Sequence, residues 1–263
     1  MKIGFIGCGN MGGALALAAA QTNNELWLTD LDDQKVSALA EKTGGKSSTV
    51  ALIAEFCDMI VLGVKPYGVA GMLATLKPIL KERFQKPLLV SMAAGVSLEQ
   101  LEGWLGDACP WIRMMPNTPV QIGKGLILYS TKNTDDAGEK AFLTVFEKAG
   151  ELIPLEEKYI DAGSALSGCG PAFAYLFVEA LADGGVACGL PRDLAIKLAA
   201  GTVAGAGEMV LQTGAHPGAL KDAVCSPGGS TIEGVAALEE NAFRSAAIQA
   251  VERAYDKTKK LGK

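Results

Sequence analysis

The sequence predicts an α/β fold, in which a doubly wound sheet is followed by an all-α domain. Strand-length apolar runs alternate with helical periodicity over about the first 150 residues, a pattern typical of doubly wound sheets. A glycine-rich turn directly follows the first of these runs. After Pro154 the strand pattern stops, and Ala, Gly and Leu recur at helical spacing. We therefore expect a dinucleotide-binding domain in residues 1–157 and a helical domain in residues 158–263.

The first strand and the turn after it carry the strongest local signal. The apolar run Lys2–Ile6 breaks into Gly7, Gly9 and Gly12, and a helix is expected over residues 11–21. A G-x-G-x-x-G pattern between a strand and a helix is the Rossmann fingerprint for dinucleotides. The first glycine permits the tight turn, the second lets a pyrophosphate approach, and the third lets the helix pack on the sheet. The free N–H groups at the helix start favour an anion. A glycine-rich turn without a ligand is the alternative.

The second strand, residues 25–30, ends in a carboxylate. Asp30 lies about twenty residues beyond the glycines, where an acidic residue can accept hydrogen bonds from the adenosine ribose. Alternatively, Asp30 or Asp32 only caps the next helix, which begins near Asp33. The choice matters because a carboxylate at the ribose repels a 2′-phosphate and favours NAD over NADP.

Two further apolar strands, residues 58–64 and 87–92, end at the edge where open α/β sheets bind ligands. The first runs into Lys65 and Pro66, and Pro66 suits the first turn of a helix that runs toward residue 83. The second runs into Ala93, Ala94 and Gly95, small residues that would let a flat nicotinamide lie close. The next helix is predicted to start with a capping box of Ser97 and Gln100.

The remaining elements complete the sheet and then the helical domain. We expect strands at residues 111–115, 125–129 and 151–155, a turn at 116–119 and a helix at 135–149. The second domain is expected to have helical stretches at residues 171–189, 192–212, 220–225 and 230–255. The first of these is apolar on most sides, so a partner subunit is a candidate to bury it.

Composition excludes several classes of function. The net charge of -5 and the absence of a Lys/Arg cluster argue against nucleic acid or an anionic membrane as the main partner. Six cysteines without a C-x-x-C pair and a single histidine, His216, predict no metal site and reduced thiols in the cytoplasm. We expect no cleaved signal, because no n-region and h-region come before the first strand in this sequence. No apolar run is expected to reach the length of a membrane span, because Glu179 and Asp183 interrupt the best candidate.

Two stretches of the helical domain closely resemble pyrroline-5-carboxylate reductases. They are Ser-Ala-Leu-Ser-Gly-Cys-Gly-Pro-Ala at residues 164–172, and residues 220–239 with their Ser-Pro-Gly-Gly-Ser-Thr motif. The resemblance extends along the chain through Gly-Phe-Ile-Gly-Cys-Gly-Asn-Met, Val-Lys-Pro, Ser-Met-Ala-Ala-Gly and Met-Pro-Asn-Thr-Pro. It implies reduction of a cyclic imine to L-proline with NADPH or NADH, the last step of proline biosynthesis. It also implies a Rossmann domain, a helical dimerisation domain and a homodimer, often assembled into a ring of dimers.

The resemblance also implies site residues. The matching threonine, Thr231, is assigned the hydrogen bond to the imine nitrogen, and hydride transfer to a protonated imine needs such orientation more than a strong acid. The backbone N–H groups of Gly229, Ser230 and Thr231 would hold the substrate carboxylate. Taken alone, the Ser-Pro-Gly-Gly stretch is better explained as a connecting turn with a helix cap, and the dinucleotide domain and the other motifs favour the substrate site. Around the nucleotide the resemblance places Asn10, Met11, Lys65, Pro66, Ala93, Ala94, Gly95 and Asn117.

The cofactor preference stays open. Family members that prefer NADPH commonly put small or basic residues after the second strand, whereas this chain has Asp30-Leu-Asp-Asp33 with Lys35 as the only nearby cation. Electrostatics favours NADH, and the family habit favours NADPH. Arg113 and His216 receive no assigned role, although a buried arginine needs a partner.

Two other functions share part of this sequence pattern. A β-hydroxyacid dehydrogenase has the same two-domain plan, but it needs a catalytic lysine that the comparable stretch, residues 167–175, lacks. A non-enzymatic NAD(P)-sensing regulator would need the glycines but not Ser230 and Thr231. Turnover of the imine separates the reductase from both.

Overall fold

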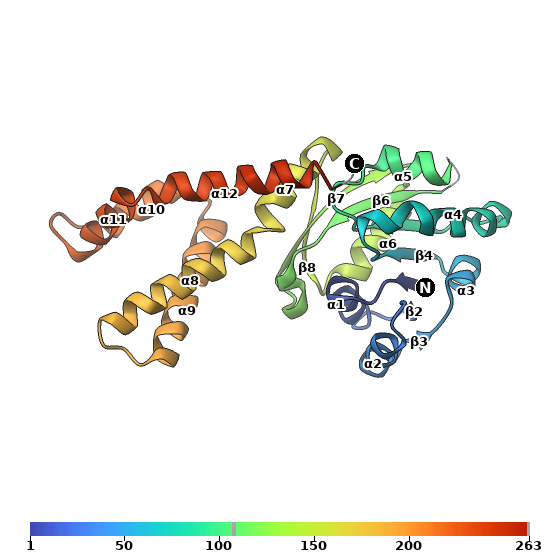
Figure 1. Ribbon diagram of the computed structural model, residues 1–263, viewed down its shortest axis with the longest axis horizontal. Coiled ribbons are helices and arrows are strands. Elements are labelled where there is room, and N and C mark those ends of the chain that lie inside the picture. Colours follow the sequence, from blue (N-terminus) through green and yellow to red (C-terminus); the bar gives the residue numbers. More distant parts are fainter. Residues whose placement is uncertain (107–108, 262–263) are drawn as a thin grey trace. The chain divides into compact units, whose positions relative to one another are not determined.

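The structure is a computed structural model that describes residues 1–106 and 109–261. It divides into two compact units (Figure 1). The first contains residues 1–169 and the C-terminal segment from Ala254, and the second is Gly170–Arg253. The first unit is α/β and the second is helical. The two compact units divide between residues 169 and 170, beyond the domain boundary that we expect after residue 157. The domain boundary itself stays a prediction.

The first unit contains an eight-stranded sheet in the order β3-β2-β1-β4-β5-β6-β7-β8. The pairs from β3 through β6 are parallel, whereas β7 runs antiparallel to β6. The connection of residues 116–124 explains this reversal, because a parallel crossover needs a dozen or more residues. The strands are β1 (Lys2–Ile6), β2 (Glu25–Thr29), β3 (Lys46–Ser47), β4 (Met59–Leu62), β5 (Leu88–Ser91), β6 (Trp111–Met115), β7 (Gly125–Lys132) and β8 (Gly150–Pro154).

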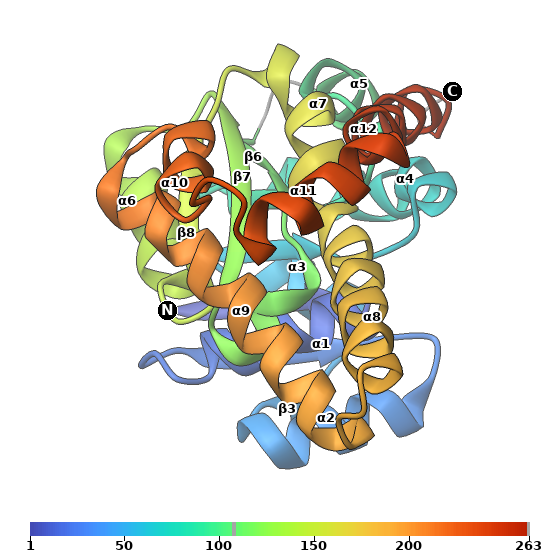
Figure 2. The same ribbon diagram turned by 90° about the vertical axis from the view of Figure 1, so that its left-hand side faces the viewer.

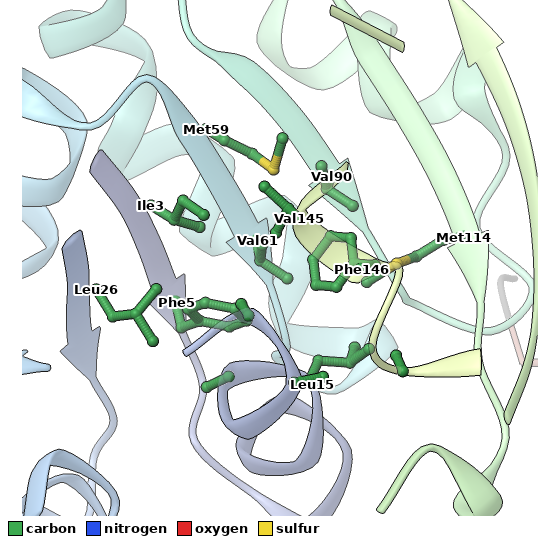
Figure 3. Packing of buried hydrophobic residues seen from close by; sticks show 14 of the residues in the cluster. Ile3, Phe5, Leu15, Leu26, Met59, Val61, Val90, Met114, Val145 and Phe146 are labelled. Atoms are coloured by element: carbon green, nitrogen blue, oxygen red, sulfur yellow. The ribbon is translucent and has the colours of Figure 1, made fainter. Parts of the chain in front are cut away.

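Helices cover both faces of this sheet, as a doubly wound fold requires. One buried cluster joins the sheet to α1 (Asn10–Ala19), α2 (Asp33–Thr43) and α6 (Asp136–Phe146). The other joins it to α3 (Val50–Phe56), α4 (Pro66–Glu82) and α5 (Leu98–Leu105). Figure 3 shows side chains of the first cluster, with Leu15 of α1 and Phe146 of α6 beside the strand residues Ile3, Phe5, Met59, Val61, Val90 and Met114.

The sequence predicted most of these elements but missed β3 and α3. The capping box of Ser97 and Gln100 is confirmed at the start of α5. The α3 helix has only seven residues, too few for a clear helical period, and Thr49 caps it by accepting from Leu52 N. It packs so closely on β1 that a Cβ at Gly4 would collide with Ile53. The glycine in an otherwise apolar strand therefore makes room for α3.

Arg113 finds its partners on α7 (Glu157–Ser167), a helix that the sequence did not predict. Its guanidinium, 2% exposed, pairs with Glu157 at 3.2 Å and with Asp161. The Glu157 carboxylate also accepts from Leu98 N at 2.6 Å, at the first residue of α5. This cluster ties β6, α5 and α7 together, and it satisfies a charge that could not be buried alone.

Replacing Arg113 with alanine should therefore destabilise the first unit. The variant leaves Glu157 and Asp161, 30% and 28% exposed, without their cation, and we expect the free energy of unfolding to fall by about 2 kcal/mol. Urea denaturation followed by circular dichroism measures it. Lys148→Ala, which removes an exposed neighbouring pair with Glu147, is the control and should change it by less than about 0.5 kcal/mol. Equal midpoints for both variants would contradict the role of the cluster.

The second unit is helical over all of its residues that form regular structure (Figure 2). Its helices α8 and α9 pack against each other through the buried residues Ala182, Ala195 and Ala199. The predicted stretch 230–255 is two helices, because Ala242 adopts a positive φ of 57° between them. The helices are α8 (Gly170–Ala187), α9 (Arg192–Thr213), α10 (Pro217–Ala223), α11 (Ser230–Glu240) and α12 (Phe243–Thr258), whose last turns belong to the first unit.

Two helical stretches, Glu157–Ala187 and Arg192–Thr213, are long and apolar enough to cross a membrane by length and composition alone. Only 11% of the most apolar part of each stretch is buried within the chain. The expectation that Glu179 and Asp183 make every apolar run too short was therefore wrong, because both stretches keep a mean hydropathy of 1.4 over such a length. Large exposed apolar side chains recur on these helices, such as Leu176 and Leu198, so the surface suits another protein as well as lipid.

Candidate active site

Five neighbouring strands end at the same edge of the sheet, and each is followed by a residue of the predicted cofactor site. The strands β2, β1, β4, β5 and β6 are adjacent and parallel, so their carboxyl ends share one edge. In this order the following residues are Asp30, Gly7, Lys65, Ala93 and Asn117. The edge of an open α/β sheet at the carboxyl ends is where nucleotides bind. The structure thus brings the predicted cofactor residues of the first unit to one edge.

The three glycines of the turn differ in why they are needed. Gly7 has a φ of 104°, and a Cβ there would lie 2.7 Å from the carbonyl of Gly63. A Cβ at Gly12 would collide with the carbonyl oxygen of Gly7, so the fold itself demands both glycines. A Cβ at Gly9 would meet nothing within 4 Å. Packing within the chain therefore does not require a glycine at position 9, and the lack of a side chain there leaves the backbone accessible to a ligand.

The start of α1 offers the donors that a pyrophosphate needs. Gly9 is the N-cap residue, and no side chain caps the helix. The first N–H within the helix ladder is that of Gly13, which donates to Gly9, so those of Asn10 and Met11 have no helical acceptor. A cavity of about 400 Å³ adjoins this turn, lined in part by Cys8, Gly9 and Asn10. The cavity continues along α1 and α2. Free donors at a helix start beside such a cavity fit a dinucleotide phosphate.

The carboxylate of Asp30 is fixed at the same turn. Cys8 N donates to its Oδ2 at 2.6 Å, and Asp32 N donates to its Oδ1 at 3.1 Å. Capping of α2 belongs to Asp32 instead, which accepts from Gln34 N and Lys35 N. Of the two roles considered for these carboxylates, capping of the helix thus belongs to Asp32, whereas Asp30 faces the glycine turn.

Two buried thiols, Cys8 at the glycine turn and Cys57 at the opposite edge of the sheet, are unreactive by their surroundings. Burial, and second the Asp30 charge, raises the pKa of Cys8 to about 11. Burial likewise raises the pKa of Cys57 to about 12. Both thiols are therefore protonated at neutral pH and are poor nucleophiles. Within residues 1–106 and 109–261, no cluster of three or more His, Cys, Asp or Glu could hold a metal ion.

The edge beyond β4 and β5 is built from a helix start and small residues. Lys65 is the N-cap of α4 with Pro66 as its first helical residue, and the Lys65 side chain is exposed. After β5, Ala93 is buried, Ala94 is half-buried and Gly95 has a φ of 75°. This conformation suits glycine, and it keeps the edge free of bulk.

Asn117 has a structural role that the sequence did not reveal. It is 6% exposed, its Nδ2 donates to Ser167 O at 3.0 Å, and its Oδ1 accepts from Leu126 N at 2.9 Å. Its side chain therefore joins the end of β6 to β7 and to the end of α7. Partners nine and fifty residues away cannot be inferred from a Pro-Asn-Thr-Pro turn.

The predicted substrate residues lie together in the second unit. Gly229 N donates to Ser226 O at 3.0 Å, and Pro227 and Gly228, with a φ of 64°, stand between them, as in a type II turn. The turn leads into α11, whose start at Gly229 has no side-chain cap. Ser230 and Thr231 occupy the exposed first turn. Free donors and two hydroxyls there can bind a carboxylate and one further polar atom.

His216 is a capping residue. Its Nδ1 accepts from Gly218 N at 3.1 Å at the start of α10. This contact accounts for the histidine that the sequence left without a role.

The open space at Gly9 predicts a separation of binding from stability. Gly9→Ala should leave the urea midpoint unchanged, because its Cβ meets no atom, but weaken binding of NADH and NADPH at least about tenfold by obstructing the pyrophosphate. Fluorescence titration measures the affinity. Gly103→Ala on α5, where a Cβ also meets nothing, is the matched control and should bind normally. Normal affinity in Gly9→Ala would place the nucleotide elsewhere.

Comparison with known proteins covers the whole chain. A family model described as pyrroline-5-carboxylate reductase dimerisation matches residues 157–261, and one described as NADP oxidoreductase, coenzyme F420-dependent, matches residues 2–95. The pyrroline-5-carboxylate reductase of Escherichia coli is 41% identical, over 100% of this chain and 98% of that protein. The enzyme of Glycine max is 41% identical, over 98% and 95%.

Solved structures agree. A pyrroline carboxylate reductase of Plasmodium falciparum with NADP bound superposes with a TM-score of 0.88 at 35% identity, over 100% of this chain and 98% of that one. The reductase of Coxiella burnetii gives a TM-score of 0.88 at 32% identity, over 99% and 98%. With two units of the expected architecture and a match along its full length, the chain belongs to the pyrroline-5-carboxylate reductase family.

Proposed function

We propose that this chain reduces pyrroline-5-carboxylate to L-proline with NADPH or NADH, as the last step of proline biosynthesis. It is an oxidoreductase that acts on a C=N bond. The observation that carries this is the uncapped, exposed start of α11 with Ser230 and Thr231, in a chain that also has a dinucleotide edge. Reduction of this substrate requires the same two parts, a group that binds its carboxylate and a source of hydride.

The predicted substrate residues have separate roles. The N–H groups of Ser230 and Thr231 bind the substrate carboxylate at the positive end of α11, and the Ser230 hydroxyl adds a donor. The N–H of Gly229, expected from the sequence to join them, instead donates to Ser226 O at 3.0 Å and shapes the turn. The Thr231 hydroxyl hydrogen-bonds the ring nitrogen and orients the imine. When bound, the reduced nicotinamide supplies the hydride to the imine carbon. The nitrogen already carries its proton in the iminium form, so no strong acid is needed.

The cofactor residues hold the two ends of the nucleotide. Gly9, Asn10 and Met11 receive the pyrophosphate on the turn that Gly7 and Gly12 shape, and Asp30 receives the adenosine ribose. Lys65 and Pro66 line the nucleotide at the start of α4, and Ala93, Ala94 and Gly95 give the nicotinamide a flat surface. Asn117 contributes through the backbone of its turn, because its side chain is hydrogen-bonded to Ser167 and Leu126.

The helical region supports assembly. It matches a dimerisation model, and the apolar faces of α8 and α9 are largely uncovered within one chain. We expect a homodimer, with rings of dimers as the larger form, and neither nucleic acid nor membrane as a partner. The enzyme is expected in the cytoplasm. Sedimentation velocity distinguishes these sizes, and a stable monomer would contradict the dimer.

Thr231 gives the sharpest test of the site. Thr231→Ala removes the oxygen that accepts the iminium N–H of the ring, so kcat should fall about 10²-fold while the affinity for the reduced cofactor is unchanged. Thr231→Ser keeps the hydroxyl and should restore most of the turnover. Thr144→Ala, which removes an exposed hydroxyl on α6, is the control and should be fully active. Full turnover in Thr231→Ala would exclude the assigned role.

The rival functions make different predictions. A β-hydroxyacid dehydrogenase would oxidise hydroxyacids, and residues 167–175 contain no lysine to act as its base. An NAD(P)-sensing regulator would bind the cofactor without turnover. Proline formation by wild-type protein, absent with hydroxyacids alone, supports the reductase.

A further inference from the structure

The corner between β2 and α2 is strongly acidic. Asp30, Asp32 and Asp33 lie within four consecutive positions, directly after the strand that neighbours the glycine turn. In Rossmann domains this corner faces the adenosine ribose, where NADP differs from NAD by a 2′-phosphate. This corner is therefore where the chain would discriminate between NAD and NADP.

The first observation is that the start of α2 is already occupied. A helix start commonly offers free N–H groups to a phosphate. Here Asp32 Oδ1 accepts from Gln34 N at 3.1 Å and from Lys35 N at 3.4 Å, and Asp33 stands in the first turn. The chain's own carboxylates fill the place that a 2′-phosphate would need.

The second observation is that the nearest cation is engaged. Lys35 Nζ pairs with Asp32 Oδ2 at 3.2 Å. The hydrogen bond from Lys35 holds the pKa of Asp32 below its usual value, so this carboxylate is ionised at neutral pH. Lys42 lines the same cavity, but it lies two helical turns further along α2, about 10 Å away by helix rise.

The third observation is the fixed carboxylate of Asp30. Each of its oxygens accepts one backbone hydrogen bond, from Cys8 N and from Asp32 N. A carboxylate oxygen has a second lone pair, so both can still accept from the neutral hydroxyls of a ribose. The same oxygens repel a dianionic phosphate at that position.

We propose that this enzyme prefers NADH to NADPH, with Asp30 as the specificity-determining residue and Asp32 closing the start of α2 to a 2′-phosphate. The inference rests on the proposed function for the position of the nucleotide. The Plasmodium falciparum relative was solved with NADP bound, so the preference would be a property of this chain's own corner.

Binding of the oxidised cofactors tests this without turnover. Isothermal titration calorimetry should give a dissociation constant for NAD⁺ at least about tenfold lower than for NADP⁺ at low salt. The ratio should shrink as salt rises to about 0.5 M, because salt screens repulsion. Tighter binding of NADP⁺, weakening with salt, would show that Lys35 attracts the phosphate and would overturn the proposal.

Two variants locate the effect. Asp32→Ser keeps a capping oxygen, removes a charge and releases Lys35, so it should tighten NADP⁺ binding severalfold more than NAD⁺ binding. Asp30→Asn should weaken the binding of NAD⁺ and bring the dissociation constants of NAD⁺ and NADP⁺ still closer together. Glu41→Gln removes the same charge near the far end of α2, and its ratio should equal that of wild type. An equal shift in all three variants would mean only a change in net charge, and would overturn the assignment to Asp30 and Asp32.

Steady-state rates separate this inference from the function. Turnover of pyrroline-5-carboxylate with a higher kcat/KM for NADPH would refute the NADH preference and leave the reductase intact. Turnover with neither cofactor, despite the expected binding ratio, would refute the reductase and leave the corner's selectivity standing.

Discussion

The close contact between α1 and the glycine turn is the constraint on which the dinucleotide site depends. A Cβ at Gly12 would collide with the carbonyl of Gly7, so the helix lies directly on the turn that ends β1. This contact brings the unpaired N–H groups of Asn10 and Met11 to the carboxyl edge of the sheet. The proposed anion site therefore rests on backbone packing, and it needs no charged side chain.

Parallel pairing then extends this single site into a row. Because β2, β1, β4, β5 and β6 are adjacent, residues that are far apart in sequence follow one another along the edge. Buried polar contacts hold the row in place: Asn117 fixes the end of β6, and Arg113 fixes the same strand to α7 and α5. Asn117 and the terminal nitrogens of Arg113 find their partners on other elements, which ties this end of the row to its surroundings.

The sequence was informative where the signal is local. The glycine spacing, the capping box of Ser97 and the family motifs all lie within short stretches, and the fold class and family followed from them. Non-local partners could not be read in this way. Arg113 meets Glu157 from 44 positions away, and Asp30 meets Cys8 from 22. The short α3 has too few residues to show a period, and apolar exposure on α8 and α9 depends on what else covers them.

The proposed reaction is hydride transfer from a nicotinamide to the carbon of a C=N bond. Incubating the enzyme with pyrroline-5-carboxylate and NADH or NADPH that carries deuterium at both C4 positions of the nicotinamide, followed by mass spectrometry, tests it most directly. Hydride transfer predicts L-proline heavier by one mass unit, with the deuterium at the former imine carbon. Unlabelled proline, or no proline with either cofactor, would contradict it.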